Sequence, residues 1–267
     1  MGSTLRARCA RFTVVVGAAA LAVAVQAGPA AAIEGGASAQ LDEFPWMALL
    51  NYTTSSGNSF RCGGSLIGNR YVVTASHCLR NAQGSTVRLG STRLDSGGTT
   101  VGVSRVVTYP GFDPSTMDND IAVLQLATPV SAGVAASVAL PSQGSDPVAG
   151  TTAELSGWGA TSPLSAAPSP DLLHSAVAVE SRTLCQSENA GHPVGLDQLC
   201  AERPGESACE GDGGDPLVAG GVLLGIQSFH RDALLLDPGH CRAATSPDVY
   251  TNVGQYMDWI NSVVSAG

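Results

Sequence analysis

The sequence predicts an all-β fold that ends in one helix. Short apolar runs are separated by glycine, proline, serine and asparagine, and this punctuation is typical of sandwiches and barrels rather than of alternating strands and helices. The runs cover residues 46–50, 64–67, 71–75, 86–89, 101–107, 121–126, 172–179 and 222–228. Each has the length of a single strand.

A C-terminal helix is predicted at about 252–265. Apolar residues recur there at helical spacing, at Val253, Met257, Ile260 and Val264. Asn252 and Gln255 stand three residues apart and fit a capping box at the start of this helix.

A proline-containing segment at 139–147 divides the chain and is the best candidate for a linker. We therefore expect two β units, the first at about 33–145 and the second at about 146–250. Residues 162–170 contain three prolines and predict a loop.

The first 32 residues have the layout of a secretory signal peptide. Arg6, Arg8 and Arg11 precede an apolar stretch at 12–25, and small residues follow as far as Ala32. The alternative is a membrane anchor, but a spanning helix needs about 20 apolar residues, more than this stretch offers. We expect cleavage after Ala32 and a secreted, extracellular protein that begins at Ile33.

The mature chain is acidic and contains no lysine. All 13 basic residues are arginine, and loss of three with the signal leaves 10 against 22 acidic residues, a net charge of −12. Nucleic acids and anionic membranes are bound by clustered cations. The charge therefore argues against both as partners.

An even number of cysteines remains after signal removal, and in an exported chain this predicts disulfide bonds. They are Cys62, Cys78, Cys185, Cys200, Cys209 and Cys241. Their spacing alone leaves several connectivities open.

Short segments from Ile33 to the C-terminal helix resemble, in the family's order, the chymotrypsin/trypsin family of secreted serine proteases. They are 33–36 (IEGG), 62–67 (CGGSLI), 74–78 (TASHC), 118–124 (DNDIAVL), 157–159 (GWG), 209–216 (CEGDGGDP) and 247–251 (PDVYT). The resemblance implies two antiparallel six-stranded β-barrels with a cleft between them. It also implies the pairs Cys62–Cys78, Cys185–Cys200 and Cys209–Cys241.

In that family a serine hydroxyl attacks the substrate after an imidazole, oriented by a buried carboxylate, accepts its proton. The resemblance assigns the imidazole to His77 and the carboxylate to Asp120. The family's Gly-Asp-Ser-Gly-Gly-Pro reads Gly-Asp-Gly-Gly-Asp-Pro here, so Gly213 occupies the position of the nucleophile. Glycine offers no hydroxyl.

No other residue replaces the missing nucleophile. The absence of lysine excludes a serine–lysine dyad, and the expected pairing of all six cysteines excludes a thiolate. The backbone N–H groups of Gly211 and Gly213 still fit an oxyanion hole, which needs amides rather than side chains. Asp215 stands where the family has a glycine, and we expect it to disturb a turn that requires positive φ.

The resemblance places four residues at the specificity pocket: Ser207, Ser228, His230 and Asp248. Ser207 at the base resembles members selective for apolar groups, whereas Asp248 replaces a wall glycine and favours a cation, so the preference stays open. Ser228 is expected beside Asp120 in a structural role, and His230 is expected to narrow the pocket mouth.

The family also buries an N-terminal ammonium beside an aspartate, because a buried carboxylate needs a paired charge. The resemblance assigns these roles to Ile33 and Asp212, and cleavage after Ala32 would expose Ile33 without a propeptide. The alternative is that Asp212 only caps a turn.

The sequence thus predicts a secreted protease homologue that has lost peptide hydrolysis and serves as a binding or regulatory protein. We expect a monomer with a protein or peptide ligand, no cofactor and no metal, because zinc, phosphate-loop and calcium-loop spacings are absent. Two alternatives remain open: a serine-type endopeptidase with weak activity through His77 and Asp120, and a passive secreted protein.

Overall fold

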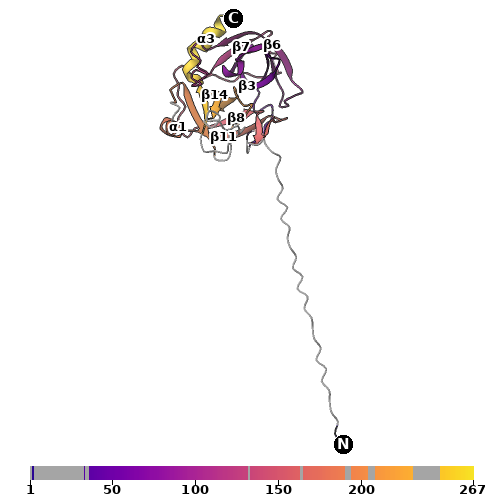
Figure 1. The fold of residues 1–267 in the computed structure, drawn as a ribbon, viewed down its shortest axis with the longest axis vertical. Coiled ribbons are helices and arrows are strands. Elements are labelled where there is room, and N and C mark those ends of the chain that lie inside the picture. The colour runs from indigo at the N-terminus through magenta and orange to yellow at the C-terminus, as the bar shows by residue number, and fades with distance from the viewer. Residues whose placement is uncertain are drawn as a thin grey trace.

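The computed structural model describes Gly2, Ile33 and residues 36–267, except 132, 163–164, 190–193, 204–207 and 231–246. Its body consists of two β-barrels and a C-terminal helix that packs beside them (Figure 1). The predicted signal peptide, Gly2 apart, lies outside the described residues. Within the described part of the chain, no helix is long and apolar enough to cross a membrane.

Six antiparallel strands close the first barrel in the order β2-β3-β4-β7-β6-β5. They are β2 (Met47–Thr54), β3 (Ser59–Ile67), β4 (Tyr71–Thr74), β5 (Ala82–Leu89), β6 (Thr99–Thr108) and β7 (Ala122–Leu126). The turn between β3 and β4 passes through Gly68 at φ +60°, a conformation that costs glycine little. This short turn pairs Leu66 with Val72 across the hairpin.

The second barrel closes in the order β8-β11-β12-β15-β14-β13, with β13 pairing back to β8. Its strands are β8 (Thr152–Gly157), β11 (Leu173–Val179), β12 (Gln198–Glu202), β13 (Pro216–Ala219), β14 (Val222–His230) and β15 (Asp248–Asn252). A short strand, β1 (Ala37–Ser38), adds to β11, and β9 (Ala160–Ser162) pairs with β10 (Ser165–Pro168). The two closed rings confirm the predicted fold class.

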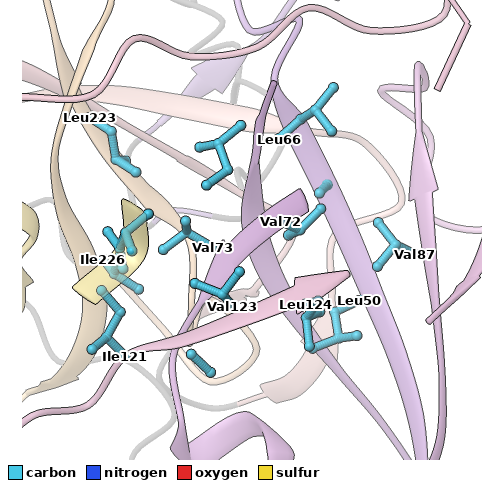
Figure 2. Close-up of a cluster of buried hydrophobic side chains, with 14 of the residues drawn as sticks. Leu50, Leu66, Val72, Val73, Val87, Ile121, Val123, Leu124, Leu223 and Ile226 are labelled. Carbon is cyan, nitrogen blue, oxygen red and sulfur yellow. The ribbon is translucent and has the colours of Figure 1, made fainter. Parts of the chain in front are cut away.

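The core of the first barrel continues into the second. Figure 2 shows Leu50, Val72 and Leu124 from the first barrel in the same buried cluster as Leu223 and Ile226 from β14. Burial of this apolar surface stabilises the fold by roughly 25 cal/mol per Å². The shared core fixes the position of β14 relative to the first barrel, and the candidate site lies where the two barrels meet.

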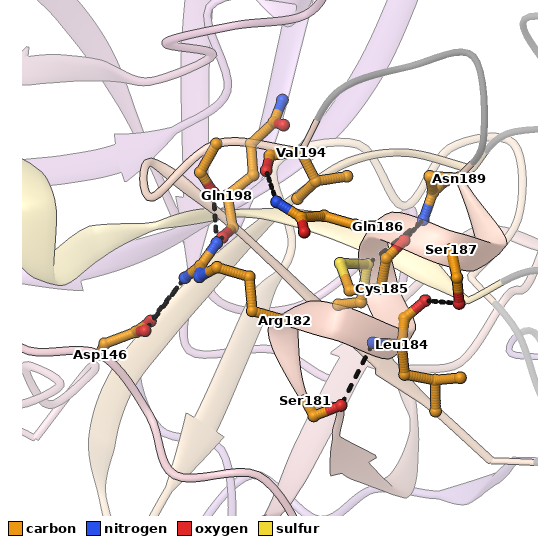
Figure 3. The surroundings of a disulfide bond; sticks show 12 residues. Asp146, Ser181, Arg182, Leu184, Cys185, Gln186, Ser187, Asn189, Val194 and Gln198 are labelled. Carbon is orange, nitrogen blue, oxygen red and sulfur yellow. Dashed lines mark hydrogen bonds and ion pairs between the residues drawn. A yellow bond between two sulfur atoms is a disulfide. The ribbon is translucent and has the colours of Figure 1, made fainter.

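A disulfide fastens helix α1 (Arg182–Glu188) to the second barrel, and an ion pair fastens it to the predicted linker (Figure 3). Leu184 N donates to the Ser181 hydroxyl at the N-cap, at 3.2 Å, and the Cys185–Cys200 disulfide joins α1 to β12. The Arg182 guanidinium contacts both Asp146 carboxylate oxygens at 3.0 Å. Asp146 belongs to the predicted linker, so this segment is tied to the second barrel.

The C-terminal helix starts later than predicted. A 3-10 turn, η2 (Val253–Tyr256), leads into α3 (Met257–Ser265). The predicted capping box is wrong: the Asn252 side chain accepts from Gly254 N, but Gln255 donates to Ser145 O at 3.2 Å. Its expected target, the Asn252 N–H, already donates to the carbonyl of Asp197.

Candidate active site

His77 and Asp120 meet at the end of two paired strands of the first barrel. His77 opens the 3-10 turn η1 (His77–Leu79) shortly after β4, and Asp120 stands just before β7. His77 Nδ1 lies 2.7 Å from Asp120 Oδ2, and the His77 backbone N–H donates to Asp120 Oδ1 at 2.8 Å. Asp120 is wholly buried. The carboxylate therefore favours the imidazole tautomer with hydrogen on Nδ1, which leaves Nε2 as the proton acceptor.

Two hydroxyl groups of the second barrel hold Asp120 from the other side. Ser228 Oγ on β14 donates to Asp120 Oδ2 at 2.6 Å, and Thr251 Oγ1 on β15 donates to the Asp120 carbonyl at 2.8 Å. A buried carboxylate is costly unless it is hydrogen-bonded. The dyad therefore depends on both barrels.

Gly213 lies against the Nε2 side of the imidazole. A Cβ atom at position 213 would lie 2.5 Å from His77 Nε2 and 3.0 Å from His77 Cε1. The Gly213 carbonyl accepts from Gly63 N at 2.9 Å, which fixes this part of the turn. The ring thus occupies space that a side chain at 213 would need.

The turn 209–215 directs two backbone amides away from the protein's own acceptors. Gly211 has φ +99° and Gly214 has φ +83°, values that favour glycine. The Gly214 N–H donates to the Gln227 carbonyl, but among the described residues the N–H groups of Gly211 and Gly213 have no hydrogen-bond partner. These two amides are available for a ligand oxyanion.

Asp212 is wholly buried behind this turn and is held by backbone amides. Its carboxylate accepts from Gly159 N at 2.7 Å and from Cys209 N at 2.8 Å. Burial raises the pKa of the Asp212 carboxyl to about 6, although these two N–H donors act in the opposite direction. Ile33 packs with Leu155 and other residues of the second-barrel core, and its only hydrogen bond within the described chain is from Gly36 N.

Asp215 lies in the same interior and is also wholly buried. Neither of its oxygens accepts a hydrogen bond from another described residue. Burial, reinforced by the charge of Asp212, raises the pKa of the Asp215 carboxyl well above its usual value. The expectation that Asp215 disturbs a positive-φ turn is wrong, because the positive φ values of this turn fall on Gly211 and Gly214.

The structure describes three of the four residues expected at the specificity pocket, and each has different neighbours. Ser228 contacts Asp120, as described above, while His230 is partly exposed at the end of β14 and pairs in register with Asp248 on β15. The Asp248 carboxylate is buried and accepts from Ala208 N at 2.8 Å. Ser207 lies outside the described residues.

Two of the expected disulfides are formed, Cys62–Cys78 and Cys185–Cys200. Cys209 is also disulfide-bonded, and Cys241 lies outside the described residues. Cys62–Cys78 connects β3 to η1 next to His77. This bond restricts the segment that carries the imidazole.

A groove of about 960 Å³ lies beside His77. Gly211 and Gly213 line it together with His77, and the aromatic side chains of Tyr52 and Phe60 form part of its wall. These rings stack with their centroids 5.6 Å apart, and Phe60 is 46% exposed. The sequence did not predict this wall, because its residues carry no motif and come together only when β2 pairs with β3.

In the described part of the chain, two groups bring three potential metal ligands together. The first is Cys62, His77 and Cys78, but its sulfur atoms form a disulfide and do not act as thiolates. The second is Glu180, Glu188 and Glu202. Burial, followed by the charges of the other two carboxylates, raises the pKa of Glu180 to about 8.

Comparison with known proteins gives a family that agrees with the two barrels and with the His77–Asp120 pair. The family model described as Trypsin matches residues 33–260. The chain belongs to the trypsin family. It is 35% identical to "Trypsin beta" of Drosophila erecta over 233 residues, 85% of this chain and 87% of that protein.

Two other trypsin-family relatives show similar identity. "Trypsin Blo t 3" of Blomia tropicalis is 35% identical over 237 residues, 85% of this chain and 84% of the relative. "Trypsin alpha-4" of Lucilia cuprina is 34% identical over 239 residues, 88% of each chain. The likeness therefore covers both barrels.

Proposed function

We propose that this trypsin-family protein has lost peptide-bond hydrolysis and binds a protein or peptide ligand in its cleft. The observation that carries the proposal is the position of Gly213 against His77 Nε2. An acyl-enzyme needs an oxygen or sulfur nucleophile at that point, and glycine has neither. This geometry supports the proposal that Gly213 replaces the catalytic serine.

Water does not compensate well for the lost nucleophile. In a protease from which triad members were removed, turnover fell about 10⁶-fold, and roughly 10³–10⁴-fold catalysis over water remained from the oxyanion hole and binding. The backbone amides of Gly211 and Gly213, which have no partner among the described residues, support the proposed ligand binding. They stabilise a bound carbonyl oxygen without requiring chemistry.

The second candidate function is weak endopeptidase activity. It is favoured by the 2.7 Å contact between His77 and Asp120, which an imidazole base would need, and by relatives named as trypsins. A passive secreted role is the third candidate, and affinity capture of a ligand from secreted extract would argue against it. We further propose that the protein is secreted, begins at Ile33 and acts as a monomer.

A covalent probe of serine hydrolases tests the main proposal. The wild-type protein should not react with a fluorophosphonate and should not hydrolyse peptide amides above background, whereas Gly213→Ser supplies a hydroxyl that the probe can modify. Gly213→Ser combined with His77→Ala is the matched control. Rapid labelling of the wild-type protein at any serine, abolished by His77→Ala, would falsify the loss of activity.

A further inference from the structure

Two backbone amides and an imidazole face the same end of the cleft. The N–H groups of Gly211 and Gly213 have no hydrogen-bond partner among the described residues, and both glycines line the groove together with His77. The His77 side chain is 25% exposed, and its Nδ1 atom contacts Asp120. Within the described chain, the neighbour of its Nε2 atom is the disulfide sulfur of Cys78, at 3.5 Å. The site therefore holds donors that the protein itself does not use.

These groups are close enough together to hold a single carboxylate. A Cβ atom on Gly213 would lie 2.5 Å from His77 Nε2. The Gly213 nitrogen is about 2.5 Å from that Cβ position, because both atoms are bonded to the same Cα, so Nε2 and this nitrogen lie within about 5 Å of each other. Hydrogen bonds of about 2.9 Å to the two oxygens of one carboxylate span that separation. The approach is possible because glycine places no side chain between them.

A carboxylate satisfies more of these donors than a peptide carbonyl does. A carbonyl has one oxygen, which the two amides engage, and Nε2 is then left without a partner. A carboxylate has a second oxygen, and a protonated imidazole donates from both ring nitrogens. Arg61 is a further cation in the described lining of the groove, but it already pairs with Asp95 at 2.7 Å. Capture of a C-terminal carboxylate by backbone amides is a recurring mode of peptide recognition.

We infer that the cleft binds the C-terminal carboxylate of a peptide, with one oxygen on the amides of Gly211 and Gly213 and the other on the protonated imidazole of His77. No covalent bond forms or breaks, and a neutral imidazole takes up one proton at Nε2 on binding. The inference deepens the proposed function and rests on it, because a bound peptide has to be retained rather than cleaved.

Proton uptake fixes the sign of a pH effect on binding. Histidine changes its charge between about pH 5 and pH 8, whereas a peptide carboxyl is already ionised throughout that range. Affinity for the carboxylate should therefore fall as the pH rises, by up to about tenfold per pH unit. In the described chain, the other ionisable groups that contact the imidazole or line the groove are Asp120, Tyr52, Arg61 and Glu210.

Paired peptides test the inference: acetyl-Ala-Ala-Phe and acetyl-Ala-Ala-Arg, each as the free acid and as the C-terminal amide. By calorimetry at pH 5.5, wild type should bind the acid of at least one pair about 10- to 100-fold more tightly than its amide, as expected for hydrogen bonds to charged groups. His77→Ala should lower this ratio by about tenfold. His174→Ala is the matched control, because that side chain is 26% exposed and pairs with Glu154; it should keep the wild-type ratio.

The pH profile separates the imidazole from a merely structural role. The wild-type ratio of acid to amide affinity should be about tenfold lower at pH 8.5 than at pH 5.5, and the ratio of His77→Ala should not change. If that variant does not fold, the wild-type profile decides alone.

Equal affinities for acid and amide at pH 5.5, or binding of neither, would overturn the inference and leave the proposed loss of hydrolysis standing. A wild-type ratio that stays constant with pH would also overturn it. Conversion of an amide to its acid during the measurement, detected by mass spectrometry, would overturn the proposed function and the inference with it.

Discussion

Replacing Gly213 by alanine should destabilise the protein through one contact with His77. The new Cβ would lie 2.5 Å from Nε2, whereas ordinary contacts begin near 3.4 Å, so the imidazole has to retreat by about 1 Å. That movement strains its 2.7 Å bond to Asp120. Overpacking of this kind costs about 1–3 kcal/mol, which lowers Tm by about 3–9 °C in a chain of this length.

A double-mutant cycle isolates this contact. Thermal unfolding is measured for Gly213→Ala with and without His77→Ala, and the cost of the new Cβ should fall below about 0.5 kcal/mol once the ring is gone. Gly102→Ala is the matched control, because its Cβ would meet only Ala127, at 4.0 Å. Equal destabilisation by Gly213→Ala in both backgrounds would show that the imidazole does not occupy this space.

Three further predictions concern stability. Ser228→Ala removes a 2.6 Å donor from buried Asp120 and should cost about 1–3 kcal/mol in denaturant unfolding; no change would contradict the role assigned to Ser228. Ile33→Ala should cost about 2–5 kcal/mol by the same measurement, because Ile33 is 0% exposed; a loss below 1 kcal/mol would exclude it from the core. Glu180→Gln should stabilise the protein more at pH 8 than at pH 4.5. Burial beside Glu188 raises the pKa of Glu180 to about 8, so the wild-type fold loses stability as the pH rises from 4.5 to 8 and the glutamine variant does not. Parallel pH profiles of unfolding free energy for the two proteins would refute this prediction.

Local sequence motifs predicted the fold and the dyad because their information is contiguous. Short punctuated apolar runs predicted strands, and the residues around His77 and Asp120 identified two segments that the structure brings to 2.7 Å. The start of the C-terminal helix was less accessible to prediction. The Asn252 N–H donates to the carbonyl of Asp197, a residue more than fifty positions away. It is therefore not available to the Gln255 side chain, as the predicted capping box required.

The surroundings of Asp215 could not be predicted from the chain alone. A glycine-to-aspartate difference in a turn suggests backbone strain, yet the consequence lies in the side chain, which enters a space bounded by Gly63 and Gly157. These glycines belong to different barrels. The groove wall of Tyr52 and Phe60 could not be predicted either, because the pairing of β2 with β3, and not a local motif, brings the two rings together.

On the proposal that hydrolysis has been lost, restoring it should require more than a hydroxyl at position 213. Gly213→Ser adds the nucleophile, but its Cβ meets the His77 ring, and the buried carboxyl of Asp215 still lies next to the turn that carries the new serine. Adding Asp215→Gly removes that side chain, and adding His230→Gly removes the imidazole expected at the pocket mouth. The rate of fluorophosphonate labelling and of amide hydrolysis should rise in that order, up to part of the ~10⁶-fold lost with a triad. His77→Ala in the triple variant should abolish the gain. A single variant as active as the triple would show that Asp215 and His230 do not obstruct the site, and that the missing serine alone separates this chain from a working protease.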